Sequence, residues 1–237
     1  MPSGMPLTES RTEQMSSTFN ALVGKIHKGI NPYEGFPVQD WPVYWGPGWD
    51  SEHRYFHEAI DLLKPSIIVE VGTFMGSSAR HMARWLAASK LDACIICVDT
   101  WLAEDVLWTN EMWRPHLKHR FGRPEFYNTF MANTITAGLQ SYIVPLPMPS
   151  SAAARYLNAL GIRSPLVYVD GDHAEGAAYA DFKNFWELVM GPAGVMLIDD
   201  YQPENTMFAG LVRDVDKFTI EQRIEPKFSG NKVWLTK

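Results

Sequence analysis

The sequence predicts an α/β fold with a mostly parallel β-sheet that is closed by an antiparallel hairpin. Short apolar runs alternate with helical patterns from residue 66 onward, as is typical of parallel strands joined by crossover helices. A glycine turn follows the first apolar run, and Ser229-Gly230-Asn231 near the C-terminus is a hairpin signal. A chain of 237 residues can bury the core of one such domain with an added segment.

The N-terminal part differs in composition, and we expect residues 1–64 to form a cap segment on a main domain of residues 65–237. The polar residues 1–17 lack the apolar core of a secretion signal and are expected to be loosely attached. Residues 31–50 are rich in proline, glycine and aromatic residues, which predicts an irregular but ordered segment. Two helices are predicted around it, over residues 18–28 and 51–63, the second with Ser51 as N-cap and ended by Pro65.

Strands and helices then alternate in the main domain. The expected strands cover residues 67–71, 94–99, 142–145, 166–170, 195–199, 219–224 and 232–235. The expected helices cover residues 77–89, 151–160, 174–190 and 207–217. Residues 101–139 interrupt this order and predict a mostly helical insertion, broken at Pro115, Gly122 and Pro124.

Composition excludes some classes of function. The hydrophobic fraction of 46% and charged fraction of 20% are ordinary for a globular protein. A formal net charge of −6 argues against a broad phosphate-binding surface, so we expect no nucleic-acid partner. No apolar stretch approaches the roughly 20 residues of a membrane span. We therefore expect no membrane partner and a cytoplasmic location.

Cys94 and Cys97 form a C-x-x-C pair, which in another setting suggests a redox or metal site. They lie in a pattern typical of a buried strand, where residues three apart point to opposite faces. A zinc site would need two further ligands at suitable spacing, and the sequence shows none. We interpret both cysteines as core residues.

The nine tryptophans are many for this length, and they concentrate in residues 31–55 and 101–127. Such aromatic segments are expected either to form a lid over a pocket or to pack as a clasp on the sheet or a subunit contact. Exposed aromatic residues in the second segment would suit a homo-oligomer.

Residues 66–77 read as a strand, a glycine turn and the start of a helix, which is typical of nucleotide-binding α/β domains. A dinucleotide site favours G-x-G-x-x-G, whose glycines let the backbone approach a pyrophosphate. Here the middle glycine is missing and Phe74-Met75 fills the turn. The pattern therefore suits a ligand without a diphosphate.

Asp99 ends the second expected strand, 27 residues after Gly72. An acid at this position can accept hydrogen bonds from both hydroxyls of a ribose. The alternative is an N-cap for a following helix. We favour the ribose role because the glycine turn and the acid are expected together, although SAM (S-adenosylmethionine) and NAD both carry a ribose.

Three further acids follow two neighbouring strands, Asp170 after one and Asp199-Asp200 after the next. Their carboxylates should converge because neighbouring strands lie about 4.8 Å apart. Close carboxylates repel one another unless a cation or a proton intervenes, and such oxygen ligands suit Mg²⁺ or a similar ion. A bound ion could lower the pKa of a substrate hydroxyl. The alternative is that one or two of these acids cap helices.

The residues after Asp170 offer further roles. Asp172 with Glu175 reads as a capping box, although Asp172 could also reach the adenine side of a cofactor. His173 has a pKa near working pH and could act as general base, or it could be a hydrogen-bonded support. The pair Ser150-Ser151 fits a helix cap better than an adenine contact.

Three ordered motifs together resemble those of class I SAM-dependent methyltransferases: Glu-Val-Gly-Thr-Phe-Met-Gly (70–76), Val-Asp-Gly-Asp-His (169–173) and Gly-Val-Met-Leu-Ile-Asp-Asp (194–200). They look most like metal-dependent small-molecule O-methyltransferases of the macrocin, mycinose and aminocoumarin group, and the cephalosporin-biosynthesis methyltransferase-like proteins. The likeness covers about residues 65–200. It implies a Rossmann-like class I methyltransferase fold with a seven-stranded, mostly parallel sheet.

The resemblance also implies roles for particular residues. The implied metal ligands, for Mg²⁺ or a similar ion, are Asp170, Asp199 and Asp200. The implied cofactor contacts are Glu70, Gly72 and Gly76, with Asp99 on the ribose, and we add Thr73, Ser77 and Ser151 to this set. The candidate catalytic residues are His173 and Asp170, either of which would take the proton of the acceptor.

We therefore expect a SAM-dependent, Mg²⁺-assisted O-methyltransferase for a small hydroxylated molecule, such as a sugar or natural-product intermediate. The sequence does not show the acceptor atom, so N-methylation stays open. Two other classes also stay open: a SAM-binding interaction protein without catalysis, and an NAD-dependent oxidoreductase. The last is less favoured because Phe74-Met75 crowds a pyrophosphate. Residues 31–56 and 101–135 are where acceptor specificity is expected.

Overall fold

The computed structural model of the chain describes residues 16–45, 48, 50–111, 115 and 117–237. Within this part, seven strands form one sheet in the order β5-β2-β1-β6-β7-β9-β8, and β3 pairs with β4 in a separate hairpin. In the large sheet only the pairs made by β9 are antiparallel. The strands are β1 (Ile67–Val71), β2 (Cys94–Asp99), β3 (His119–Arg120), β4 (Arg123–Pro124), β5 (Ile143–Pro147), β6 (Leu166–Val169), β7 (Val195–Ile198), β8 (Lys227–Ser229) and β9 (Lys232–Thr236).

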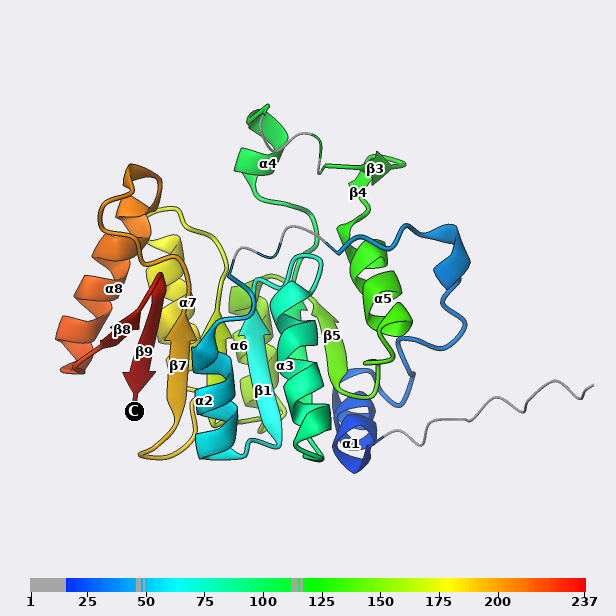
Figure 1. The fold of residues 1–237 in the computed structure, drawn as a ribbon, viewed down its shortest axis with the longest axis horizontal. Helices are drawn as coiled ribbons and strands as arrows, with labels where there is room; N and C mark the ends of the chain where they lie inside the picture. The colour runs from blue at the N-terminus through cyan, green and yellow to red at the C-terminus, as the bar shows by residue number, and fades with distance from the viewer. Residues whose placement is uncertain (1–15, 46–47, 49, 112–114, 116) are drawn as a thin grey trace, which may run out of the picture.

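Helices cover both faces of the large sheet. Figure 1 shows α2 and α3 in front of the strands and α6 behind them, while α7 packs on β6 and on α8. The helices are α1 (Ser17–Ile26), α2 (Arg54–Leu63), α3 (Ser77–Ala88), α4 (Asp105–Thr109), α5 (Phe126–Thr136), α6 (Ser150–Ala159), α7 (Ala177–Trp186) and α8 (Ala209–Gln222), with short 3₁₀ turns η1 (Val38–Asp40) and η3 (Thr206–Phe208). Among the described residues, no helix is both long and apolar enough to cross a bilayer.

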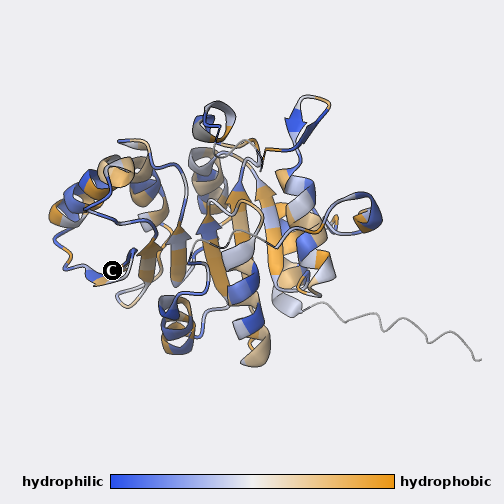
Figure 2. Cartoon of the chain, turned by 45° about the horizontal axis from the view of Figure 1, so that its top comes forward, coloured by the Kyte–Doolittle hydropathy of each residue, from blue (hydrophilic) through white to orange (hydrophobic). Residues whose placement is uncertain are grey.

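The parallel strands and β9 are almost entirely buried because both faces of this part of the sheet are covered, whereas the edge strand β8 is mostly exposed. In Figure 2 the central strands are mostly orange, the colour of hydrophobic residues, and the outer sides of the helices carry the blue of hydrophilic residues. The buried side chains form one cluster, to which α1 contributes Phe19, Leu22, Val23 and Ile26. The N-terminal helix is thus part of the same core as the sheet and packs on its edge strand β5.

The predicted alternation is confirmed in most of the main domain, and the seven-stranded, mostly parallel sheet is as expected. The strand predicted over residues 219–224 is wrong, because α8 continues to Gln222 and the strand of the hairpin is β8. Leu211, Val215 and Phe218 recur at helical spacing and are all buried, which explains why the helix extends so far.

Two further local predictions are corrected. Ser51 is not the N-cap of α2, which begins at Arg54; the imidazole of His53 accepts the N–H of Tyr55 instead, at 3.2 Å. The insertion is less helical than expected, since α4 and α5 are separated by the hairpin β3–β4, which turns at Phe121-Gly122. Both turn residues have positive φ (53° and 76°), and glycine adopts this conformation at little cost. Residues 1–15, expected to be loosely attached, lie outside the described part.

The glycine turn after β1 requires glycine for two reasons. Gly72 has a φ of 82°, and a Cβ there would lie 1.8 Å from the carbonyl oxygen of Asp170 at the end of β6. Gly76 has a φ of 78°, and a Cβ there would lie 2.7 Å from the ring of Phe130 on α5. The first contact is with backbone and cannot be relieved by a side-chain movement. Gly72 therefore lets the turn lie directly against the end of the neighbouring strand.

We expect Gly72→Ala to lower the free energy of unfolding by more than about 3 kcal/mol, because a backbone clash adds to the cost of the left-handed conformation. Gly161→Ala is the matched control: its φ is 65°, but nothing lies within 4 Å of the added Cβ. The control should lose only about 1–2 kcal/mol. Urea unfolding measures both, and equal losses would show that the close approach to Asp170 contributes nothing.

Candidate active site

A cavity of about 830 Å³ opens at the carboxyl edge of the sheet, where ligands bind in folds of this kind. It is lined by many of the residues predicted from the sequence: Gly72, Thr73, Ser77, Asp99, Asp170, His173, Asp199 and Asp200. The other three predicted site residues, Glu70, Gly76 and Ser151, are not among its lining residues. Ser151 is exposed on α6, whereas its neighbour Ser150 lines the cavity.

Asp99 holds the glycine turn in place from the end of β2. Its Oδ2 accepts the backbone N–H groups of Thr73 (3.0 Å) and Phe74 (2.7 Å), and its Oδ1 accepts that of Trp101 (2.6 Å). Burial raises the pKa of Asp99, and the backbone hydrogen bonds act in the opposite direction. No helix begins directly after Asp99, since the next one is α4, so the N-cap interpretation does not apply.

Phe74 adopts the left-handed conformation in this turn, with a φ of 49°. A phenylalanine in this conformation is strained and needs support from its surroundings. The ring packs against that of Phe126, with centroids 4.6 Å apart, and the carbonyl accepts the indole N–H of Trp101 at 2.6 Å. Phe74, which stands where a dinucleotide-binding motif has its middle glycine, thus forms part of an aromatic wall of the cavity together with Phe126.

Glu70 lies fully buried beneath the turn. Its carboxylate accepts the hydroxyls of Thr73 (3.1 Å) and Ser78 and the thiol of Cys97 (3.5 Å). Burial raises the pKa of Glu70 to about 7, and the hydroxyl bonds offset only part of that effect. In the absence of ligand, Glu70 therefore supports the turn from below.

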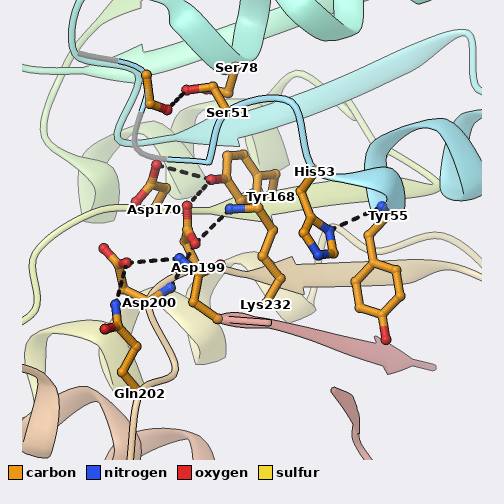
Figure 3. A network of polar contacts seen from close by, with 12 residues as sticks. Ser51, His53, Tyr55, Ser78, Tyr168, Asp170, Asp199, Asp200, Gln202 and Lys232 are labelled. Carbon is orange, nitrogen blue, oxygen red and sulfur yellow. Dashed lines mark hydrogen bonds and ion pairs between the residues drawn. The ribbon is translucent and has the colours of Figure 1, made fainter. Parts of the chain in front are cut away.

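A buried lysine that was not predicted from the sequence lies behind the cavity wall, beside Asp199 (Figure 3). The ammonium of Lys232, on β9, donates to Asp199 Oδ1 at 2.7 Å, and the side chain is fully buried. The same oxygen accepts the N–H of Asp200 at 2.8 Å, while Asp199 Oδ2 accepts the hydroxyl of Tyr168. Both oxygens of Asp199 therefore already have protein donors.

Asp170, His173 and Asp200 form a second group at this end, with one ligand atom from each lying within 4.8 Å of the others. Nε2 of His173 is 3.2 Å from Asp200 Oδ2. Burial alone would lower the pKa of His173, but the nearby carboxylates, Asp200 foremost, outweigh it and raise the pKa to about 9. The pKa of Asp170 is raised well above its usual value by burial and then by the carboxylates of Asp199 and Asp200.

This arrangement differs from the predicted metal set. Asp199, predicted as a ligand, is held by Lys232, and His173 joins Asp170 and Asp200 instead. Three carboxylates lie close together here with Lys232 and a protonated His173, and their mutual repulsion contributes to the raised pKa of Asp170. A bound cation would relieve this repulsion.

The predicted capping box is wrong. Asp172 accepts the N–H of Ala174 at 2.8 Å, but α7 begins only at Ala177, after Gly176. Glu175 does not reach back to Asp172; it pairs with Arg213, 2.7 Å away on α8. The N-terminus of α7 is instead bound from α8, where Asp214 Oδ2 accepts the N–H groups of Gly176 (2.8 Å) and Tyr179 (3.1 Å).

The structure also tests the predictions made for the two cysteines and for part of the aromatic segments. Cys94 and Cys97 are free, buried thiols with different neighbours, as predicted. Trp101 is 2% exposed and lines the cavity together with Glu104 and Leu107, so the start of the insertion forms part of its wall. The tryptophans at 49 and 113 lie outside the described residues.

Four buried or half-buried charged residues near the cavity were missed: Arg80, Glu104, Asp181 and Lys232. Burial raises the pKa of Glu104 to about 7 and that of Asp181 to about 6. A lysine between Asn231 and Val233 gives a signal, since a charged residue opening an otherwise apolar strand needs a partner. Arg80 and Asp181 lie in helices among other polar residues, where no such signal exists.

We expect Glu70→Gln to change how stability depends on pH. Because burial holds the folded-state pKa of Glu70 near 7, above 4.5 for the unfolded chain, the wild type binds this proton more tightly when folded. The wild type should therefore lose stability relative to the variant as pH rises from about 4.5 to 7, by up to about 3 kcal/mol. Urea unfolding of both proteins across this range measures it, and a constant difference would contradict the prediction.

We expect Asp199→Asn to lower the free energy of unfolding by about 3–5 kcal/mol, because it leaves the ammonium of Lys232 buried without a carboxylate. Adding Lys232→Met removes the unpaired charge and should restore most of the loss. Thermal and urea unfolding of the two single variants and the double variant give the coupling energy. Purely additive losses would mean that the two groups do not depend on each other.

Comparison with known proteins agrees with this geometry. Residues 69–201 match the family model described as "Methyltransferase domain", which is more than half of the chain. No curated protein sequence matches.

Solved structures with a similar fold include three described as methyltransferases. The O-methyltransferase TomG from Streptomyces achromogenes, solved with SAM, is 16% identical with a TM-score of 0.56, over 96% of this chain and 93% of its own. An O-methyltransferase from Bacillus cereus, solved with SAH, is 12% identical with a TM-score of 0.55, over 96% and 94%. CalS11, a calicheamicin methyltransferase, is 14% identical with a TM-score of 0.56, over 100% and 98%.

At these identities the structural matches show the fold alone, and the family match carries the assignment. The glycine turn, the acid ending β2 and the cavity at the carboxyl edge all lie within or beside the matched residues. The chain therefore belongs to the methyltransferase-domain family and is a SAM-dependent methyltransferase with the Rossmann-like class I fold.

Proposed function

We propose that this enzyme is an O-methyltransferase that acts on a hydroxyl of a small molecule with the help of a divalent metal ion. The observation that carries the proposal is one cavity lined by both the glycine turn and the group Asp170, His173 and Asp200. A methyl donor on the turn and an acceptor oxygen at the acidic end would then meet in the same space. Methyl transfer by in-line displacement depends mainly on such alignment.

The donor would lie along the turn. Asp99 is the candidate for the ribose hydroxyls, since it sits at the cavity wall and is fixed by the backbone of Thr73, Phe74 and Trp101. Gly72, Thr73 and Ser77 line the same wall. Glu70 lies below them, and we propose that it acts on the donor through Thr73 and Ser78, whose hydroxyls it accepts.

The residues at the acidic end fit a divalent ion. Asp170, His173 and Asp200 offer two carboxylates and an imidazole, and a cation among them would relieve the repulsion between the carboxylates. We propose these three as the metal-holding residues, with Asp199 as the partner of Lys232. A bound ion would supply Lewis-acid activation, lowering the pKa of the acceptor hydroxyl. The imidazole in this set favours Fe²⁺ or Zn²⁺, whereas the two carboxylates suit Mg²⁺ or Mn²⁺, which prefer oxygen ligands.

The chain's own groups would manage the proton. The hydroxyl of Tyr168 lies between Asp199 and Asp170, with its oxygen 3.0 Å from Asp170 Oδ2, so its one proton is shared between two carboxyl groups; Asp170 also lines the cavity. His173 and Asp170 are the candidates to take the proton of the acceptor hydroxyl. Whichever of them does so cannot hold the ion through the same atom, and His173, whose pKa is raised to about 9, must first lose its own proton. The ring of His173 is held edge-on to Phe208, with centroids 5.2 Å apart, so its position is defined by packing as well as by Asp200.

The acceptor is proposed to be a sugar or natural-product intermediate. CalS11 is described as a TDP-rhamnose 3′-O-methyltransferase, and TomG as taking part in tomaymycin synthesis; both share the fold. The lining residues Trp101, Leu107, Phe126, Met207 and Phe208 give the cavity apolar surface on which a ring could pack.

The test begins with calorimetric titration of SAM and, separately, of Mn²⁺ into the purified protein. Asp200→Asn should keep SAM binding, lose at least about tenfold in Mn²⁺ affinity and lose roughly 100-fold in turnover of any acceptor found by screening. Asp216→Asn, an exposed acid on α8, is the control and should change none of these. SAM binding with turnover that is insensitive to chelators and to Asp170→Asn and Asp200→Asn would remove the metal from the proposal. Methylated nitrogen in the product would replace O- with N-methylation.

A further inference from the structure

The cavity wall contains a buried positive charge that forms no ion pair with an acid in the described part of the chain, where Glu70 acts on it only through its charge. Arg80, in the first turns of α3, is 3% exposed and lines the cavity. Its Nη1 donates to the carbonyl of Met75 at 2.6 Å, while Nε is buried and has no hydrogen-bond partner among the described residues. Burial lowers the pKa of Arg80 to about 10. A buried guanidinium is normally paired with a carboxylate or phosphate, because desolvation of an unpaired charge is costly.

The surroundings hold this side chain in position. Asn133, on α5, donates to the same Met75 carbonyl at 3.1 Å and also bonds the backbone of Tyr44 in both directions, at 2.8 Å each. The next residue, Trp45, lies over the guanidinium, with Cζ of Arg80 5.0 Å from the centre of the ring. The guanidinium is therefore fixed between the glycine turn and the N-terminal segment before any ligand binds. Such preorganisation favours binding of a planar anion.

The position of Arg80 relative to Asp99 indicates which anion it would bind. Thr73 and Phe74, in the first half of the turn, bind Asp99, whereas Met75, in the second half, binds Arg80. A donor with its ribose at Asp99 that extends along the turn would bring its amino-acid end toward Arg80. The N-terminus of α3 lies at the same place and also favours negative charge.

We propose that Arg80 binds the carboxylate of the amino-acid end of SAM and supplies the charge that holds this end against the glycine turn. The inference rests on the use of SAM by this enzyme. The acidic group Asp170, His173 and Asp200 lies elsewhere on the cavity wall, after β6 and β7. The two ends of the cavity then have opposite charge, which gives the donor a defined direction.

The experiment compares the binding of SAM and of decarboxylated SAM, which lacks only the carboxylate, by calorimetry. In the wild type SAM should bind about 10- to 100-fold more tightly, as expected for a charge-assisted bond in a buried site. In Arg80→Met the two ligands should bind with the same affinity, because decarboxylated SAM never used the guanidinium. Unchanged binding of decarboxylated SAM also shows that the variant is folded.

Two further variants complete the test. Arg84→Met, an exposed arginine on the same helix, should keep the full preference for SAM. Arg80→Lys keeps a point charge without the planar fork and should keep only part of the preference; it serves as the test if Arg80→Met does not fold. A preference for SAM that survives in Arg80→Met would overturn the inference. Failure of the wild type to bind either ligand would contradict SAM use itself, a separate outcome.

Discussion

The contact between the glycine turn and the end of β6 is the constraint on which the site depends. Gly72 lies so close to the backbone of Asp170 that no side chain fits between them. The turn proposed to hold the donor and the acid proposed to face the acceptor therefore belong to one junction between neighbouring strands. This junction sets the spacing of the two groups, and Trp101 and Phe126 of the insertion support the turn at Phe74.

Three buried carboxyl groups around this junction have hydrogen-bond donors or a counter-charge from the protein itself. Asp99 is held by three backbone N–H groups, Glu70 by two hydroxyls and a thiol, and Asp199 by a lysine, a tyrosine and a backbone N–H. Each of these would be costly to bury alone. Nε of Arg80 is one of several buried polar atoms without a hydrogen-bond partner among the described residues, and it lies in the cavity wall, as do Asp170 and Asp200. These are the two places where we propose that ligand groups bind.

Much of the fold could be predicted from the sequence because strands buried on both faces leave apolar runs, and because glycine and aspartate mark the turns after them. Asp99, Asp170, Asp199 and Asp200 could be identified because each of them ends or directly follows such an apolar run. Lys232 was missed as the partner of Asp199 because the pair depends on β9 lying beside β7, which no local pattern shows. The hairpin β3–β4 and the real start of α7 were missed because non-local contacts, such as Asp214 with Gly176, decide them. Arg80 gave no signal because a single arginine in a polar helix face is common.

The position of Lys232 on β9 has a consequence for the order of folding. The acids it neutralises follow β6 and β7, so these strands can pair before β9 is added beside β7. Until β9 is in place, Asp199 has no counter-charge and remains in contact with water, which disfavours closure of the core around Tyr168 and Phe56. The same ion pair thus links completion of the sheet to assembly of the catalytic end, so that a partly folded chain should have no competent site.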